Sequence, residues 1–267
     1  MTNPPSVLTI AGNEATGGAG AQADLKTFQA LGVSGSLALT CIVSFDPAKE
    51  WAHRFVPVEP GVIADQLEAI HAAHNLAAVK IGMLGTPGAI QAVAQFLAEH
   101  RPQHLVLDPV LICKGQEPGA ALDTDNALKE QVLPLATFVT PNHFESLSLS
   151  GMQSIDTLED LKEAARIIHE LSGATVLAKG SIRLEGSQAF DVFYDGSTLE
   201  VLESPKIGQG EAVAGAGCTL AAALTAFLAQ GLDPLEAARQ AKAFVTAGIE
   251  QRLVSKAPFA ALRQINR

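Results

Sequence analysis

The sequence has few cysteines and few charged residues, and each shortage excludes a class of protein. Its three cysteines, Cys41, Cys113 and Cys218, are odd in number and far apart, so they fit neither a zinc site nor a framework of disulfides. Charged residues make up 17% of the 267 positions and hydrophobic residues 48%. These proportions exclude a disordered chain and are ample for a large core.

The chain also lacks a long, uninterrupted apolar run. Its first residues, "MTNPPSVLTIAG", contain no basic segment before an apolar stretch, and the apolar residues near 213–230 are interrupted by Thr219, Thr225 and Gln230. We therefore expect no signal peptide, no membrane span and a cytoplasmic location. The formal net charge of −10 disfavours nucleic acid or an anionic membrane as the main partner, but allows an anionic ligand in a local pocket.

What the chain does have is an alternation of strand-like and helix-like segments, which apolar runs and helical spacing respectively predict. The predicted strands are 6–12, 36–45, 77–84, 104–111, 137–142 and 174–180, followed by a hairpin of 188–196 and 197–204. The predicted helices are 20–32, 60–74, 87–100, 124–136, 143–151, 157–173, 217–231 and 234–251. This order predicts one α/β domain over residues 1–267, a doubly wound and mostly parallel central sheet with helices on both faces. Ligands of such folds bind beyond the carboxyl ends of the strands.

The stretch "AVAGAGCTLAAALTAFLAQG", residues 213–232, opens a helix on glycines. With Gly215 and Gly217 leaving the backbone bare, the amides of Ala216, Gly217 and Cys218 can converge on one anion, and the helix dipole adds positive potential. At this helix start we expect Cys218 to favour the thiolate and to accept a proton from an attacking hydroxyl. The alternative is a small, buried and inert cysteine.

Four polar residues follow predicted strands or begin a helix after one. Asp108 follows "LVL", Lys179 ends "AKG", and "TPNHFE" places Asn142 and Glu145 three apart at a helix start. Asp108, Asn142 and Glu145 together can hold hydrated Mg²⁺ beside phosphate oxygens, while Lys179 neutralises phosphate charge. The alternatives are a helix cap for Asn142, a favourable dipole interaction for Glu145 and a solvated lysine.

Two loops carry further candidates. "GAGAQA", residues 18–23, matches the glycine pattern of dinucleotide sites, but the turn after Gly12 is too long for that fold. We interpret it as a loop whose backbone closes over a small substrate, and a nicotinamide-dependent dehydrogenase remains a remote alternative. "DPVLICKGQEPGAAL", residues 108–122, is typical of a mobile lid, in which Cys113 either adds reversibly to an aldehyde or has no role.

Taken together, these motifs resemble the vitamin kinase branch of the ribokinase-like superfamily, whose members are ATP-dependent kinases for pyridoxal and hydroxymethylpyrimidine. The resemblance covers about residues 6–252 and rests on "AGNEATGGAGAQADLKTFQALGV", "VKIGML", "LDPVLICKG", "TPNHFE", "AKG" and "GAGCT". "CKG" together with "GAGCT" is similar to the sub-branch that has two active-site cysteines. The resemblance implies a ribokinase-like fold, ATP and Mg²⁺, a small-molecule vitamer substrate and a homodimer.

The resemblance also implies a role for each candidate residue. Gly215, Ala216 and Gly217 form the anion hole, and Cys218 is the catalytic base. The substrate-binding residues are Asn13, Glu14, Gly20, Phe45, Met83 and Cys113, of which Cys113 forms a hemithioacetal with pyridoxal. The ATP-binding residues are Asp108, Asn142, Glu145, Lys179, Ser181 and Gly217, with Asp108 and Glu145 as the metal ligands.

Substrate choice depends on the second predicted strand. Hydroxymethylpyrimidine phosphate kinases typically have a glutamine where this chain has Phe45, and an aromatic side chain suits the pyridine ring better, so we favour a B6 vitamer. Hydroxymethylpyrimidine kinase activity is the alternative. Three features depart from the family pattern: Asn13 with Glu14 in the first loop, Ala214 in place of histidine, and Ser181 in place of glycine. A non-catalytic vitamin-binding protein is the remote alternative.

Overall fold

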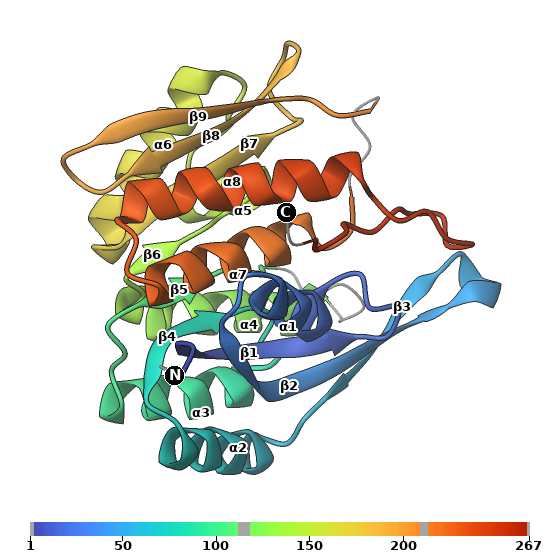
Figure 1. Cartoon of the computed structure of the whole chain (residues 1–267), viewed down its shortest axis with the longest axis vertical. Helices are drawn as coiled ribbons and strands as arrows, with labels where there is room; N and C mark the ends of the chain where they lie inside the picture. The colour runs from blue at the N-terminus through green and yellow to red at the C-terminus, as the bar shows by residue number, and fades with distance from the viewer. Residues whose placement is uncertain (1–2, 112–117, 209–212, 266–267) are drawn as a thin grey trace.

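A nine-stranded sheet forms the centre of the molecule (Figure 1), in the order β3-β2-β1-β4-β5-β6-β7-β8-β9. The computed structural model describes residues 3–111, 118–208 and 213–265. Neighbours from β2 to β7 pair in parallel, whereas β3, β8 and β9 pair antiparallel. The strands are β1 (Ser6–Glu14), β2 (Ser34–Asp46), β3 (Ala52–Pro57), β4 (Leu76–Ile81), β5 (Leu105–Leu107), β6 (Phe138–Val139), β7 (Thr175–Ser181), β8 (Gln188–Tyr194) and β9 (Leu199–Pro205). The prediction of a doubly wound, mostly parallel sheet is confirmed.

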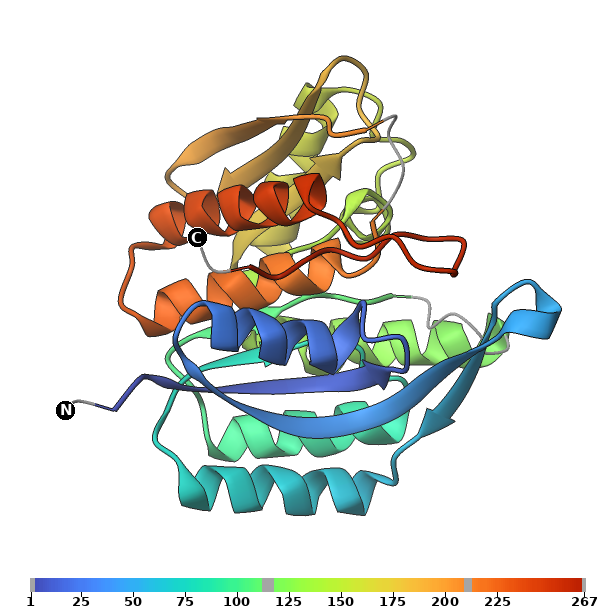
Figure 2. The ribbon, with the colours of Figure 1, turned by 45° about the vertical axis from the view of Figure 1, so that its right-hand side comes forward.

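Helices cover both faces of the sheet. One face packs against α1 (Gly20–Ala30), α7 (Ala216–Ala229) and α8 (Pro234–Glu250), which lie side by side in Figures 1 and 2. The other face packs against α2 (Pro60–Ala73), α3 (Pro87–Glu99), α4 (Pro118–Gln131), α5 (His143–Ser150) and α6 (Leu158–Ser172). Within the part of the chain that the structure describes, no helix combines the length and apolarity needed to cross a bilayer.

Alternating side chains of the central strands supply both halves of the core. In β1, Leu8 and Ile10 join the cluster beneath α2 and α3, while Val7 joins the cluster beneath α1 and α7. In β4, Val79 and Ile81 face the first cluster and Ala78 the second. Since each strand is buried on both sides, its sequence is a continuous apolar run, as parallel strands require.

Two predicted segments are wrong in part. The sequence predicts a lid over residues 108–122, yet α4 begins at Pro118, because proline is a favourable first residue of a helix. The prediction also missed β3, which forms the β2–β3 hairpin (residues 34–57) that extends away from the body in Figure 2. Most residues of β3 are exposed, so its sequence lacks the apolar alternation that marks a half-buried strand.

Candidate active site

The N-terminus of α7 lies where two distant parts of the chain meet. Gly215 adopts the left-handed conformation, with φ of 79°, and α7 begins at the next residue. The carbonyl oxygen of Gly18 lies so close to Gly215 that a side chain there would clash with it. The loop between β1 and α1, which contains Gly18, therefore packs directly on the start of α7. Glycine is required at 215 because of its backbone conformation and because there is no space for a side chain.

Cys218 lies in the first turn of α7 and contacts this same loop. The backbone N–H of Gly20, at the start of α1, donates to Cys218 Sγ at 3.4 Å. Cys218 is half-buried, in contrast to the fully buried Cys41. The cysteine predicted as a base is thus held by the loop predicted to bind substrate.

The expectation that Cys218 favours the thiolate is wrong for the protein without ligands. Burial raises the pKa of Cys218 to about 11, and the carboxylates of Asp108 and Asp24 raise it further. The positive charge of Lys80 and the hydrogen bond from Gly20 lower it, but they do not offset the loss of water. The favourable dipole of α7 is visible in the sequence, whereas burial by neighbouring elements is not.

Asp108 and Lys179 form a buried ion pair in front of α7. Asp108 follows β5 and Lys179 lies in β7, and Lys179 Nζ donates to Asp108 Oδ1 at 3.0 Å. The hydroxyl of Thr140 also donates to Oδ1, at 3.3 Å. A Cβ at Gly217 would lie 3.4 Å from Lys179 Nζ and 3.8 Å from Asp108 Oδ2. The ion pair therefore lies next to the first turn of α7, at Gly217, where no side chain separates the charged groups from the helix backbone.

Asn142 and Glu145 form a capping box at the start of α5. The Asn142 side chain accepts from the Glu145 N–H at 3.0 Å, and Glu145 Oε2 accepts from the Asn142 N–H at 2.7 Å. Burial raises the pKa of Glu145 to about 8, although the charge of Lys179 opposes this rise. The helix-capping alternative is confirmed for Asn142, and the pair remains next to the charges of Lys179 and Asp108.

The loop after β1 is organised by Glu14. One of its carboxylate oxygens accepts from the N–H of Thr16 at 2.6 Å, and the other accepts from the N–H of Gly18 at 3.0 Å and the Thr16 hydroxyl at 2.8 Å. Asn13 forms a backbone bridge with Gly20. Glu14 thus fixes the backbone that meets α7, and Asn13, which is half-buried, is tied to the same loop through its backbone.

Aromatic side chains gather at the tip of the β2–β3 hairpin, next to the turn that joins the two strands. The ring of Phe45 lies 4.9 Å from that of His53, 5.4 Å from Phe259 and 6.1 Å from Trp51, measured between centroids. Phe259 belongs to the segment after α8, which approaches the hairpin in Figure 2. Met83 follows β4, and its sulfur lies 3.8 Å from the position of a Cβ on Gly12.

The remaining candidates lie at the margins or outside the described residues. Ser181 ends β7 in the left-handed conformation, with φ of 51°, and its N–H donates to Asp191 Oδ1 at 3.5 Å. Ala214 forms backbone hydrogen bonds with Ala260 and Leu262 of the C-terminal segment, at 2.9 and 3.0 Å. Cys113 lies outside the described residues.

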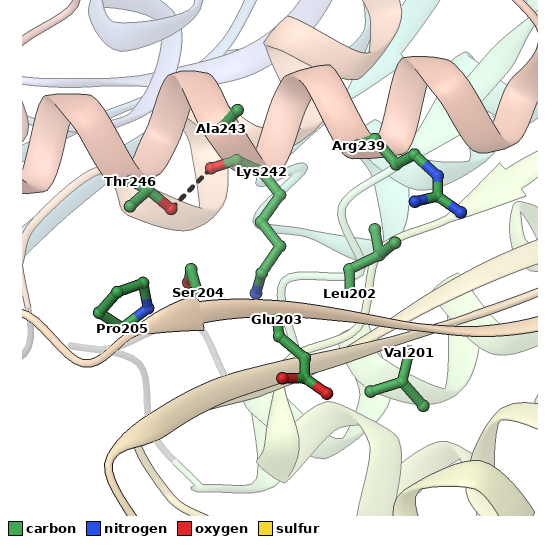
Figure 3. A pocket seen from close by; sticks show the side chains of 9 residues that line it. All are labelled: Val201, Leu202, Glu203, Ser204, Pro205, Arg239, Lys242, Ala243 and Thr246. Carbon is green, nitrogen blue, oxygen red and sulfur yellow. Dashed lines mark hydrogen bonds between the residues drawn. The ribbon is translucent and has the colours of Figure 1, made fainter.

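A groove of about 490 Å³ lies between β9 and α8 (Figure 3). Lys242 reaches from α8 to the sheet, where its Nζ donates to Asp191 Oδ2 at 2.7 Å and to the carbonyl of Ala189 at 3.1 Å. The sequence predicted neither this groove nor its lysine. The lining residues are Val201, Leu202, Glu203, Ser204, Pro205, Arg239, Lys242, Ala243 and Thr246.

Two further charged residues near Cys218 were also missed, Lys80 in β4 and Asp24 in α1. Both side chains are fully buried and form an ion pair of 2.8 Å. The signal in the sequence was a lysine in the middle of the apolar strand "AAVKIGML".

Comparison with known proteins places the chain among vitamin kinases. The family model described as phosphomethylpyrimidine kinase matches residues 14–259. Pyridoxine kinase of Bacillus subtilis is 45% identical over 244 residues, which is 91% of this chain and 90% of that protein. An ADP complex of Bacillus subtilis pyridoxal kinase superposes with a TM-score of 0.92 at 43% identity, covering 98% of this chain and 97% of the other. Staphylococcus aureus pyridoxal kinase in complex with AMP-PCP and pyridoxal gives a TM-score of 0.91 at 37% identity, covering 99% and 95%.

Proposed function

The chain belongs to the phosphomethylpyrimidine kinase family, and we propose that it transfers the terminal phosphoryl group of ATP to the hydroxymethyl group of pyridoxal and related B6 vitamers. The observation that carries this proposal is the meeting of Gly217, Cys218, Asp108 and Lys179 at the start of α7. Backbone amides, a lysine and a proton acceptor are the groups that phosphoryl transfer needs.

In this proposal the first turn of α7 and Lys179 hold the transferring phosphoryl group. The acceptor oxygen forms a bond to the terminal phosphorus, the bond from that phosphorus to the bridging oxygen breaks, and ADP leaves. The proton of the acceptor hydroxyl passes to Cys218 in its thiolate form, which becomes the neutral thiol. The amides of Gly217 and Cys218 face the charge that develops on the phosphoryl oxygens. The N–H of Ala216, which the sequence also predicts for this role, instead donates to the carbonyl of Val213 at 3.4 Å.

Mg²⁺ fits the carboxylates of Asp108 and Glu145. Asp108 Oδ1 is engaged by Lys179 and Thr140, and Glu145 Oε2 caps α5, which leaves Asp108 Oδ2 and Glu145 Oε1 without a hydrogen bond from the described residues. Mg²⁺ in kinases typically uses one or two carboxylates together with phosphate oxygens and water. When bound, it would neutralise phosphate charge.

The groove between β9 and α8 suits the nucleoside of ATP. β9 lies two strands from β7, or about 10 Å at the usual strand spacing, a distance that a triphosphate can bridge. Asp191 links the two regions, because it accepts from the N–H of Ser181 and from Lys242.

The aromatic cluster around Phe45 favours a pyridine ring as the acceptor's core. Phe45 lies in β2, which pairs with β1 next to it. Since Glu14 of β1 pairs with Val43 of β2, the ring of Phe45 belongs to a strand that borders the loop of Glu14. Hydroxymethylpyrimidine kinase activity is the second candidate, supported by the description of the matching family.

The test compares ATP consumption with pyridoxal, pyridoxine, pyridoxamine and hydroxymethylpyrimidine side by side. We expect the B6 vitamers to be preferred, and Phe45→Gln to shift preference toward the pyrimidine. A wide preference of the unaltered protein for hydroxymethylpyrimidine would contradict the vitamer proposal and support the second candidate.

The two-cysteine sub-branch adds a specific expectation for the aldehyde. If this chain follows that sub-branch, the sulfur of Cys113 bonds to the aldehyde carbon of pyridoxal and the thiol proton passes to the aldehyde oxygen, which gives a hemithioacetal. Cys113→Ser should therefore reduce turnover of pyridoxal far more than that of pyridoxine, which has no aldehyde. Equal losses would remove this role.

We also propose that the protein is a homodimer, assembled through the β2–β3 hairpin. Ile42 and Val56 pair across this hairpin and are 44% and 58% exposed. Directly paired residues share a face, so the two form one apolar contact surface.

A further inference from the structure

A lysine and an aspartate are buried where the fold would accept apolar side chains. Lys80 lies two residues after Ala78 in β4, on the face that α1 and α7 cover, and Asp24 comes from α1. Both side chains have zero exposure, and Lys80 Nζ donates to Asp24 Oδ2 at 2.8 Å. The hydroxyl of Thr9 donates to the same oxygen at 2.6 Å.

This ion pair lies close enough to Cys218 for both of its charges to act on the sulfur. Asp24 follows Gly20 by four residues, so the two lie on the same side of α1, one helical turn apart. Gly20 is the residue whose N–H donates to Cys218 Sγ. At the end of β4, a Cβ on Gly82 would lie 2.6 Å from Lys80 Nζ, so glycine there leaves room for the ammonium group. The charge of Lys80 lowers the pKa of Cys218, and the charge on the sulfur in turn raises the pKa of Lys80.

Lys80 remains charged in this position. Burial lowers its pKa, but the carboxylates of Asp24 and Asp108, together with the sulfur of Cys218, more than offset this effect and raise the pKa above its ordinary value. Lys80 therefore keeps its positive charge at neutral pH, where it acts on the sulfur of Cys218.

Stability alone does not account for the pair. Buried ion pairs are often neutral or unfavourable relative to apolar residues of similar size, because both charges lose their water. Asp24 Oδ1 is buried without a hydrogen-bond partner among the described residues, which adds to that cost. A costly charge pair adjacent to the proton acceptor indicates a role in the reaction.

We propose that Lys80, fixed by Asp24 and Thr9, is a positioning residue that acts through Cys218 by stabilising its thiolate before the proton transfer. The inference rests on the proposed function. Only the thiolate can accept a proton: the O–H bond of the acceptor breaks, an S–H bond forms, and the freed oxygen electrons form the bond to phosphorus. Lys80 does not contact the substrate.

Four charged groups act on the sulfur of Cys218, and they differ in whether they favour its thiolate form. Lys80 from β4 favours the thiolate, whereas Asp24 from α1 and Asp108 after β5 disfavour it. Lys179 from β7 also interacts with the sulfur. The proposal therefore predicts opposite effects for two substitutions within one ion pair, which a purely structural role would not produce.

The experiment measures the rate at which iodoacetamide modifies Cys218 as a function of pH, with the modified peptide identified by mass spectrometry. In the double variant Asp24→Asn/Lys80→Met, which leaves no uncompensated charge, we expect modification at pH 8 to be about tenfold slower, equivalent to one pKa unit. In Asp24→Asn alone, Lys80 is unopposed and modification should be faster than in the unaltered protein.

Kinase turnover provides the second readout. The double variant should lose turnover at neutral pH and recover part of it at alkaline pH, with the KM for ATP unchanged. Glu159→Gln/Lys162→Met removes an exposed ion pair of 2.7 Å on α6, on the opposite face of the sheet from α7, and should leave the modification rate of Cys218 unaltered.

Equal modification rates in the unaltered protein and in the folded double variant would overturn the proposal. Slower modification without any kinase activity in the unaltered protein would instead support the influence of Lys80 on the thiol and contradict the proposed function. Thermal unfolding of each variant distinguishes either result from a failure to fold.

Discussion

At the scale of single residues, Cys218 carries the most specific expectation. Removing a positioned general base typically reduces turnover by about 10²–10⁴-fold. Cys218→Ala should reduce phosphorylation of pyridoxine by that order, while binding of ATP persists because the amides of α7 remain. Steady-state turnover together with calorimetric measurement of ATP binding checks both halves of the prediction.

Cys218→Asp provides the matched comparison. An aspartate carboxylate can accept a proton from the acceptor hydroxyl, whereas alanine cannot, so this variant should keep more activity than Cys218→Ala. Turnover of Cys218→Ala at close to the rate of the unaltered protein would show that the thiol is not the base. The main contribution of "GAGCT" would then come from its backbone amides.

Ser181 gives a prediction about stability. Its φ of 51° lies in the left-handed region, where a side chain typically costs about 1 kcal/mol or more and glycine does not. Ser181→Gly should therefore raise the free energy of unfolding by up to about 1 kcal/mol, measured by denaturant titration.

Ser187→Gly is the control for this substitution. Ser187 is exposed in the same region of the chain and has a negative φ, so glycine there should lower stability through the greater freedom of the unfolded chain. If both substitutions lower stability equally, the backbone of Ser181 is not strained.

At the scale of elements, two helices begin with the same type of capping box but in different surroundings. In α5, Glu145 is buried, and burial raises its pKa to about 8. In α6, Asp160 is exposed, and hydrogen bonds from Thr157 and Asp156 lower its pKa. The same local motif therefore predicts opposite dependences of stability on pH.

For α5, stability should fall as pH rises. Because the pKa of Glu145 is higher in the folded protein than the ordinary 4.5, the fold favours the protonated form, and this contribution is lost between about pH 4.5 and 8. Glu145→Gln keeps an acceptor for the Asn142 N–H but cannot ionise. Relative to the unaltered protein, this variant should gain stability steadily from pH 5 to pH 8 in denaturant titrations.

For α6, the pKa of Asp160 is lower in the folded protein, so its contribution is present above the ordinary 3.8 and is lost as pH falls further. Asp160→Asn should consequently show a constant stability difference from pH 5 to pH 8. A flat difference for Glu145→Gln over the same range would contradict the burial of an ionisable Glu145.

The sequence predicted the elements well where their burial follows a simple period. The strands around Asp108 and Lys179 and the helix after Gly215 could be identified because apolar runs, glycines and capping residues are local signals. The exposed strand β3 was missed because it has no buried face, and the start of α4 was taken for a lid because proline and glycine mark helix starts as well as loops.

The site was predicted in position but not in charge. Because the carboxyl ends of parallel strands share one edge of the sheet, Asp108 and Lys179 could be expected to lie near Gly217. Protonation depends on burial by elements far away in sequence, so neither the raised pKa of Cys218 nor that of Glu145 could be predicted. The pairing of Lys80 with Asp24 likewise joins residues 56 positions apart.

At the scale of the whole molecule, the chain has a net charge of −10, although the ATP of the proposed reaction is itself an anion. Two lysines supply positive charge locally. Lys80 and Lys179 both lie on the face of the sheet that α7 covers, next to the N-terminus of that helix. Each of these lysines is paired with an aspartate, Lys80 with Asp24 and Lys179 with Asp108, so the attraction for an anion comes from how these charges and the N-terminus of α7 are oriented.

Self-association is the prediction that belongs to this scale. β3 is an edge strand, and the exposed pair Ile42 and Val56 lies on one face of the β2–β3 hairpin. An edge strand with apolar neighbours favours contact with a second chain, which would bury both. We expect sedimentation equilibrium at micromolar concentrations to give twice the mass of the 27.8 kDa chain.

Ile42→Lys/Val56→Lys should convert this dimer to a monomer, because four lysines would face one another across a symmetric contact. Leu171→Lys is the matched control, since Leu171 is 64% exposed on α6, at a distance from the hairpin, and its substitution should leave the mass unchanged. A monomeric unaltered protein would contradict the dimer, and a dimer that persists in the double variant would place the contact elsewhere. Because Phe45 and Trp51 lie on the same hairpin, loss of the dimer should also weaken binding of the vitamer more than that of ATP.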